Sequence, residues 1–331
     1  MKTTQTVRFH QAGDASVLQI DTLDMPKPGV GEVRIKAAAI GLNRAEVMFR
    51  NGAYIEQPSY PSKIGYEVSG VIDAVGEGVT DLKCGDIVST IPAFTMGEYG
   101  VYGKHPIVPA FAVAKYPTHL SPAEGTAIWM QYVTAYGALC EVGKLTSDQT
   151  ILITAASSSV GIAAIQIANW IGATVIATTR GPEKVTSLKQ AGAHYVIESD
   201  SESISQSVNL ITEGQGANLI FDPIGGPLLN ELGDAAAQAG IIIEYGALDP
   251  NPSIYPLFKA LEKALTIVGY TLFELTQDPV RLERAKQFIY QGLEQKKLFP
   301  KVDKIFAFED IQSAHRYMEA SEQIGKIVVK I

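Results

Sequence analysis

The feature of this 331-residue sequence that most restricts its fold is a regular alternation of apolar runs and helical patterns in its second half. Six apolar runs of strand length are separated by segments long enough to cross between parallel strands. The runs are Thr150–Thr154, Ala173–Thr178, His194–Ile197, Asn218–Phe221, Gly240–Glu244 and Leu265–Val268. The pattern predicts an α/β fold with a doubly wound (Rossmann), parallel six-stranded sheet and helices on both faces.

The residues on either side of this region predict a second domain. From about Val7 to Ala114, short strands are separated by glycine- and proline-containing turns, which is typical of a compact, β-rich and partly barrel-like unit. The chain ends in an apolar strand, Gly325–Ile331, which we expect to return to this unit. We therefore place the β-rich domain at residues 1–122 and 273–331, and the Rossmann domain at residues 123–272 as an insertion.

Composition favours a globular protein and excludes several classes of partner. Hydrophobic residues make up 46% of the chain and charged residues 19%, so a large core can form without disulfides or metal. We interpret Cys84 and Cys140 as inert core thiols. The net charge of −8, with basic residues spread along the chain, argues against nucleic acid and against an anionic membrane surface. No apolar stretch approaches a membrane span and no signal core is visible, so we expect a cytoplasmic protein.

The segment Ile151–Gly161 has the order of a dinucleotide-binding turn: a buried strand, small residues and a helix start. Backbone amides at such a helix start favour the pyrophosphate of the ligand. Of the three usual glycines only Gly161 is present, because Ala155 and Ser158 stand near the other two places. The hydroxyls of Ser157–Ser159 can donate to phosphate and partly compensate. The alternative is an ordinary strand-to-helix turn.

The end of the second strand predicts which cofactor binds. NAD is normally held there by an acidic residue, but this sequence has Thr179 and Arg180, followed by Lys184. Arg180 can bind a 2′-phosphate with two hydrogen bonds and Lys184 can add a point charge, whereas Glu183 is expected to face solvent. We therefore predict NADPH. Two solvated basic residues are the alternative.

Two further strands end in small or turn-forming residues. Phe221–Gly226 and Glu244–Leu248 each follow an apolar run. Because the carboxyl ends of strands line the ligand crevice in open α/β sheets, we expect both segments at the cofactor site. Each could instead be an ordinary loop.

Motifs along nearly the whole chain resemble the quinone oxidoreductase branch of the medium-chain dehydrogenase/reductase family. They include Gly41–Glu46, Tyr60–Ile72, Val75–Val79, Lys83–Val88, the serine-rich turn, Asp222–Gly226 and Gly325–Val328. The resemblance implies a GroES-like catalytic domain beside the Rossmann domain. It also implies reduction of a small carbonyl or quinone substrate by NADPH. With the motifs above, it gives these candidate cofactor-binding residues: Asn43, Thr134, Ser157, Ser158, Ser159, Val160, Gly161, Thr179, Arg180, Lys184, Asp222, Ile224, Tyr245, Gly246, Ala247, Tyr270, Thr271 and Lys326.

The sequence departs from the zinc enzymes of this family. The positions that match their catalytic zinc ligands are Asn43, Tyr66 and Met130, which are poor ligands for zinc. No cysteine lies between Ile91 and Phe111, and we interpret the five histidines as surface or loop residues. We therefore predict no metal. Without a Lewis acid, quinones and α,β-unsaturated carbonyls are favoured as substrates, because conjugation already spreads the developing charge.

The resemblance assigns the catalytic roles to Asn43, Tyr54 and Tyr66. Asn43 is expected to contact the cofactor ribose or the substrate oxygen, Tyr54 to donate to an enolate, and Tyr66 to be a further donor; Thr134 is expected to contact the carboxamide. Each tyrosine could instead be a packed residue, and water could equally supply the proton.

Other readings stay open. The chain could reduce aldehydes or ketones, could be an enoyl reductase, or could bind the cofactor without catalysis. Because the sixth strand is apolar and is expected at a sheet edge, we expect a homodimer.

Overall fold

The computed structural model describes residues 2–331, and these residues form two compact units. Residues up to Met130 and Pro300–Ile331 form the first unit, and Gln131–Phe299 form the second. The C-terminal strand β15 (Lys326–Lys330) pairs antiparallel with β3 (Glu32–Gly41), so the tail returns to the first unit as predicted.

The units divide at other residues than those expected from sequence. Helix α11 (Pro279–Glu294) lies in the second unit, where Arg281 pairs with Glu141 and Phe288 packs on Trp170. These contacts join segments far apart in the sequence, so the local pattern after residue 272 did not reveal them.

The second unit contains a parallel six-stranded sheet with the order β10-β9-β8-β11-β12-β13. Its strands are β8 (Thr150–Ile153), β9 (Thr174–Thr179), β10 (Tyr195–Glu198), β11 (Ala217–Asp222), β12 (Ala236–Glu244) and β13 (Thr266–Gly269). This confirms the predicted sheet and places the sixth strand at its edge.

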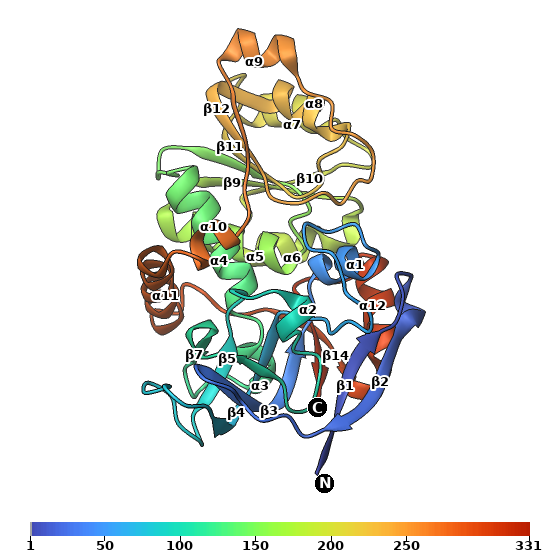
Figure 1. Cartoon of the computed structure of the whole chain (residues 1–331). Coiled ribbons are helices and arrows are strands. Elements are labelled where there is room, and N and C mark those ends of the chain that lie inside the picture. Colours follow the sequence, from blue (N-terminus) through green and yellow to red (C-terminus); the bar gives the residue numbers. More distant parts are fainter. Residues whose placement is uncertain (1) are drawn as a thin grey trace. The chain divides into compact units, whose positions relative to one another are not determined.

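Helices cover both faces of this sheet (Figure 1). The helices of the second unit are α4 (Trp129–Tyr136), α5 (Ser159–Ile171), α6 (Val185–Ala191), α7 (Ile204–Ile211), α8 (Leu228–Ala235), α9 (Leu257–Lys263), α10 (Phe273–Thr276) and α11. Helices α7 and α8 pack on Leu152, Ile176, Ile220 and Ile242 from neighbouring strands, and α5 and α6 lie on the other face.

The first unit is built on a seven-stranded, mostly antiparallel sheet with the order β14-β15-β3-β4-β5-β7, in which β6 also pairs with β3. Its remaining strands are β4 (Glu67–Val75), β5 (Ile87–Thr90), β6 (Ile107–Pro109), β7 (Val113–Lys115) and β14 (Val302–Ala307), and β1 (Thr3–Phe9) and β2 (Leu18–Asp24) form a separate ribbon. The helices are α1 (Arg44–Arg50), α2 (Met96–Tyr99), α3 (Pro122–Gly125) and α12 (Ile311–Glu319). Among residues 2–331, no helix is both long and apolar enough to cross a membrane.

Two interpretations from the sequence are wrong. Cys84 is exposed and Cys140 is only partly buried, so Cys84 is not a core thiol. His315 is fully buried, because it lies on the inner side of α12, where its ring packs against Tyr102 and its Nδ1 lies 2.8 Å from Nη1 of Arg50. Burial lowers the pKa of His315 to about 3, so this side chain is neutral.

Candidate functional site

The serine-rich turn joins β8 to the start of α5. At Ala155 the backbone has a φ of +44°, which is the left-handed region that favours glycine. The turn therefore keeps the conformation of a glycine that the sequence lacks. Ser158 caps the helix, since its Oγ accepts a hydrogen bond of 3.0 Å from the amide of Gly161.

Gly161 allows α5 to begin directly against this turn. A Cβ atom at this position would lie 2.5 Å from the carbonyl oxygen of Ala156 and 2.6 Å from its Cα. Both atoms belong to the backbone and cannot rotate away. The close packing predicted for Gly161 is therefore confirmed.

The end of β9 carries the two basic side chains expected near a 2′-phosphate. Arg180 is exposed, and among the ion pairs of the described chain none involves it. Lys184 is largely buried, and its Nζ lies 3.4 Å from the Ser157 hydroxyl at the serine-rich turn. Thr179 is buried, and Glu183 is exposed as predicted. Hydroxyls, helix-start amides and two cations thus meet the requirements of an anionic ligand.

A buried carboxylate organises the ends of β8 and β11. Asp222 is fully buried and accepts hydrogen bonds from the Thr154 hydroxyl and, at 2.7 Å, from the Gly225 amide. The ring of Tyr245 stacks on that of Phe221, with centroids 3.9 Å apart. Asp222 thus holds the loop after β11 and does not face solvent.

The remaining candidates of the second unit differ in exposure. Gly246, Ala247 and Thr271 are exposed, and Ile224 is partly buried. Tyr270 and Thr134 are buried, and the Tyr270 hydroxyl lies 3.5 Å from the Val133 carbonyl oxygen.

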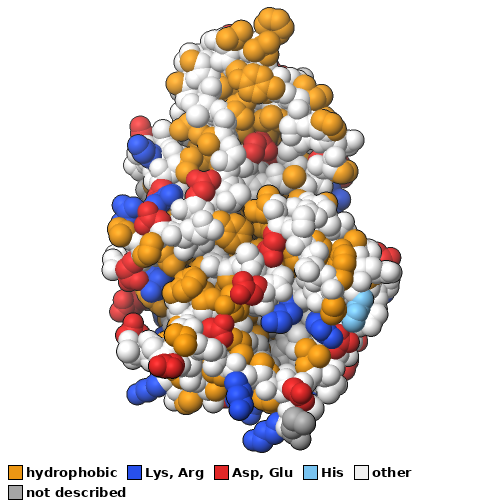
Figure 2. Space-filling view, in the orientation of Figure 1, with side chains coloured by type: hydrophobic (Ala, Val, Ile, Leu, Met, Phe, Trp, Pro, Cys, Tyr) orange, Lys and Arg blue, Asp and Glu red, His pale blue; other side chains and the backbone are white. Residues whose placement is uncertain are grey.

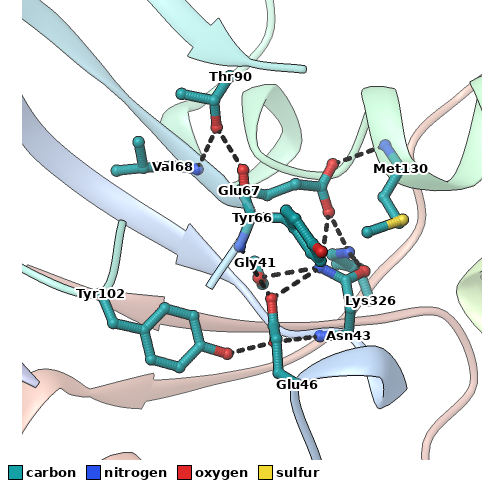
Figure 3. Close-up of polar contacts among 10 residues, drawn as sticks. All are labelled: Gly41, Asn43, Glu46, Tyr66, Glu67, Val68, Thr90, Tyr102, Met130 and Lys326. Atoms are coloured by element: carbon teal, nitrogen blue, oxygen red, sulfur yellow. Dashed lines mark hydrogen bonds and ion pairs between the residues drawn. The ribbon is translucent and has the colours of Figure 1, made fainter. Parts of the chain in front are cut away.

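In the first unit, Lys326 forms a buried ion pair with Glu67 (Figure 3). Both side chains are essentially inaccessible to solvent. Nζ of Lys326 also lies 2.5 Å from Oδ1 of Asn43, and Oε1 of Glu67 accepts a hydrogen bond of 2.9 Å from the Met130 amide. Lys326 therefore neutralises a buried carboxylate here, and its assignment as a direct cofactor contact rests on the sequence alone.

Asn43 joins this ion pair to a second buried carboxylate, Glu46. The Asn43 side-chain amide lies 3.2 Å from both Glu67 and Glu46, and its backbone amide donates to Glu46 at 2.6 Å. Glu46 also accepts hydrogen bonds from the Tyr102 hydroxyl and the Tyr66 amide. Burial raises the pKa of Glu46 to about 7, and these donors oppose that shift. The Asn43 amide is thus turned toward neighbouring protein groups, which the sequence could not reveal.

Tyr54 and Tyr66 form a hydrogen-bonded pair beside this cluster. Burial raises the pKa of Tyr54 to about 12, while the hydrogen bond to Tyr66 lowers it. Burial also raises the pKa of Tyr66, and there the same hydrogen bond acts in the raising direction. Both phenols therefore keep their protons near neutral pH and can act as hydrogen-bond donors.

Glu56 anchors the loop that carries Tyr54. Its two carboxylate oxygens accept hydrogen bonds of 3.0 Å and 2.9 Å from the amides of Met96 and Gly97 at the start of α2. The loop is thereby held two residues beyond Tyr54.

The three positions expected to replace zinc ligands surround the ion pair of Lys326 with Glu67. Asn43 and Met130 both bond to Glu67, and Tyr66 precedes it (Figure 3). Within residues 2–331 no group of three or more His, Cys, Asp or Glu side chains is arranged to hold a metal ion. The zinc-free site stays a prediction. What the geometry shows is that an ammonium group supplies the positive charge at this place.

Comparison with known proteins agrees with both units. A profile of the alcohol dehydrogenase GroES-like domain matches residues 29–142, and one of zinc-binding dehydrogenases matches residues 159–287. Quinone oxidoreductase of Pseudomonas aeruginosa is 26% identical over 324 residues, which is 98% of each chain. 2-Haloacrylate reductase of a Burkholderia species is 26% identical over 331 residues, which is 97% of each chain. The structure of Escherichia coli quinone oxidoreductase, complexed with NADPH, has a TM-score of 0.92 and 25% identity over 100% of both chains.

These matches and the fold define a two-domain oxidoreductase with one GroES-like and one Rossmann domain. The chain belongs to the medium-chain dehydrogenase/reductase family and is of the quinone oxidoreductase-like type, as its motifs indicated.

Proposed function

We propose that this protein uses NADPH to reduce a quinone or an α,β-unsaturated carbonyl compound without metal assistance. The observation that carries the proposal is the cationic end of β9, where Arg180 is exposed and Lys184 reaches the Ser157 hydroxyl. A nucleotide with a 2′-phosphate matches this charge, whereas NAD lacks the group that would use it. The NADPH complex of the Escherichia coli relative supports the same cofactor.

The residues that hold the cofactor in this proposal lie on the second unit. Amides and hydroxyls of residues 157–161 bind the pyrophosphate at the start of α5, and Arg180 and Lys184 bind the 2′-phosphate. NADPH, when bound, supplies a hydride. The protein contributes orientation and hydrogen-bond donors, because its own side chains offer no redox chemistry for this reaction.

Tyr54 is the donor that we assign to the substrate oxygen. Burial raises the pKa of Tyr54 to about 12, so its hydroxyl keeps the proton that it donates to the substrate oxygen in this proposal. A donor of this kind stabilises the oxygen on which charge develops during reduction. Tyr66 acts through Tyr54, and Asn43 acts by fixing Glu67 and Glu46 beneath them.

The names of two relatives support this substrate class. One is a quinone oxidoreductase and the other reduces 2-haloacrylate, which contains a carbon–carbon double bond conjugated to a carboxylate. In both substrates the negative charge that develops as the hydride is added is delocalised over a conjugated system.

Replacing Tyr54 with Phe is expected to lower kcat about a hundredfold on at least one member of a panel of quinones and enones, because one hydrogen-bond donor to the developing oxyanion is lost. NADPH oxidation by wild type and variant over this panel, with product analysis, is the measurement. Tyr317→Phe is the control, since Tyr317 lies on α12 and its exposed hydroxyl donates to Asp303 of β14.

The same panel separates the alternatives. Full activity of the Tyr54 variant on every substrate would remove Tyr54 from the mechanism. Turnover of simple aldehydes alone would favour the carbonyl reductase reading, and saturable NADPH binding without any turnover would favour a binding protein.

We also propose a homodimer formed through the second unit. Strand β13 is the edge of the sheet, and hydrophobic side chains of the neighbouring helix α9 are exposed, among them Leu257, Phe258 and Leu261, which are 51%, 82% and 71% accessible. Figure 2 shows hydrophobic side chains gathered over the region of α9. A bare strand edge beside an apolar patch is a common site of self-association.

Light scattering of the purified protein is expected to give about twice the 35.5 kDa mass of one chain. Phe258→Lys, which places a charge on the exposed face of α9, is expected to shift the protein toward monomer, while Val280→Lys on α11 serves as a matched control with a 70% exposed side chain. A monomeric wild type at micromolar concentration would contradict the proposal.

A further inference from the structure

Two carboxyl groups face each other at the ends of β11 and β12, and the mechanism above uses neither as an acid. Asp222 is the last residue of β11, Glu244 is the last residue of β12, and the two residues are paired directly in the parallel sheet. Directly paired residues of a sheet place their side chains on the same face, so the two carboxyl groups lie next to each other. Two carboxyl groups this close do not readily both ionise, and a proton on one of them lets it donate to the other.

The surroundings identify which group carries the proton. Asp222 accepts hydrogen bonds from the Thr154 hydroxyl and the Gly225 amide, and such donors stabilise its anion. The Oε1 atom of Glu244 is buried, and it has no hydrogen-bond partner. Glu244 is therefore the neutral acid and the donor to Asp222.

No positive group offsets the pair. Among residues 2–331, neither Asp222 nor Glu244 forms an ion pair with a lysine, arginine or histidine. The titratable groups on the adjoining segments are Tyr245 after β12, Asp249 in the next loop, whose amide bonds to the Ile224 carbonyl, and Tyr270 after β13, whose amide bonds to the Glu244 carbonyl. Neither a tyrosine nor an aspartate can supply a positive charge, so these groups would not compensate a second negative charge at this place.

We propose that Asp222 and Glu244 hold one proton between them at neutral pH, and that this proton controls how tightly the carboxyl edge of the sheet binds the anionic cofactor. The proposal rests on the proposed NADPH site, because the pair ends β11 and β12 in the same sheet in which β8 and β9 lead into that site, and β11 is the neighbour of β8. Losing the proton places two adjacent carboxylates at this edge and repels the phosphates of NADPH. The protein then binds NADPH best while the pair keeps its proton.

Burial and the adjacent Asp222 raise the pKa of Glu244 to about 8, which sets the range in which the effect is measurable. If the doubly ionised pair binds NADPH poorly, the dissociation constant rises up to about tenfold between pH 7 and pH 9. Glu244→Gln keeps a donor to Asp222 but carries no titrating proton. Its dissociation constant is expected to change less than about twofold over the same range.

The test measures NADPH dissociation constants of the full chain by calorimetry at pH 7, 8 and 9 for wild type, Glu244→Gln and Glu294→Gln. Glu294 is an exposed glutamate at the end of α11, and its variant is expected to follow wild type. Calorimetry in buffers of different ionisation enthalpy adds a measurement without mutation, since wild type at pH 9 is expected to take up a proton when NADPH binds. A wild-type constant that does not vary with pH, or a Gln variant as steep as wild type, would overturn the proposal.

Thermal stability of the protein without cofactor distinguishes failure of this inference from failure of the proposed function. The folded state keeps a proton on Glu244 that the unfolded chain loses above its ordinary pKa of 4.5, so stability falls as pH rises from there to about 8. The melting temperature of Glu244→Gln minus that of wild type is the quantity to compare at two pH values. This difference is expected to be several degrees larger at pH 8.5 than at pH 5. If this pH-dependent difference in melting temperature is found but NADPH does not bind at any pH, the shared proton is supported and the proposed NADPH site is rejected. If the difference in melting temperature is the same at both pH values, the shared proton is rejected.

Discussion

Replacing Lys326 with Met is expected to lower the free energy of unfolding by about 3–5 kcal/mol, because it leaves the Glu67 carboxylate buried without its cation. Both side chains of this ion pair are almost inaccessible to water, so solvent cannot take the place of the ammonium group. Asn43 loses a hydrogen bond of 2.5 Å in the same change. Urea denaturation followed by circular dichroism measures the difference.

Lys330→Met is the matched control, because Lys330 ends the same strand with an exposed side chain. Its unfolding free energy is expected to stay within about 0.5 kcal/mol of wild type. The double variant Lys326→Met with Glu67→Gln is expected to recover part of the loss, since it removes the uncompensated charge. A Lys326→Met protein as stable as wild type would show that the Lys326 ammonium group is not needed to compensate the charge of the buried Glu67 carboxylate.

Replacing Arg180 with Ala is expected to weaken NADPH binding about 10- to 100-fold and to leave NADH binding within about twofold. The guanidinium group can form charge-assisted hydrogen bonds to the 2′-phosphate, each worth about 1.5–3 kcal/mol, and the exposure of Arg180 favours the lower part of that range. Fluorescence titration of wild type and variant with both nucleotides measures the selectivity directly.

Lys189→Ala is the control for this change, because Lys189 is an exposed cation in the last turn of α6. This control tests whether the loss of any positive charge in this part of the second unit is enough to weaken NADPH binding. Equal weakening of NADPH and NADH by Arg180→Ala would count against a 2′-phosphate site at the end of β9.

The sequence was sufficient for the parts of the fold that depend on local pattern. The alternation of apolar runs predicted all six strands of the second unit and their parallel arrangement. The attachment of α11 to that unit was missed, because it depends on contacts such as that of Arg281 with Glu141. His315 was misread for a similar reason, since only the packing of α12 shows which side of the helix is buried.

The same distinction applies to the candidate site. Ser157, Arg180 and Lys184 follow strand ends within a short stretch of sequence, and the structure brings Lys184 to Ser157. Glu244 was missed, because an acid at the end of an apolar run has no special signal until the neighbouring strand places Asp222 beside it. The Lys326 and Glu67 pair joins residues far apart in the chain, which no spacing rule reveals.

The anchoring of the loop around Tyr54 has a consequence for substrate size. Because Glu56 ties this loop to the amides of Met96 and Gly97, the Tyr54 phenol of the proposed mechanism needs little ordering when a substrate binds. A mobile donor would lose conformational entropy when the substrate binds, and extra contacts with the substrate would have to offset that cost. An anchored donor avoids most of this cost. A compact molecule with few atoms beyond its conjugated system can therefore still be held productively.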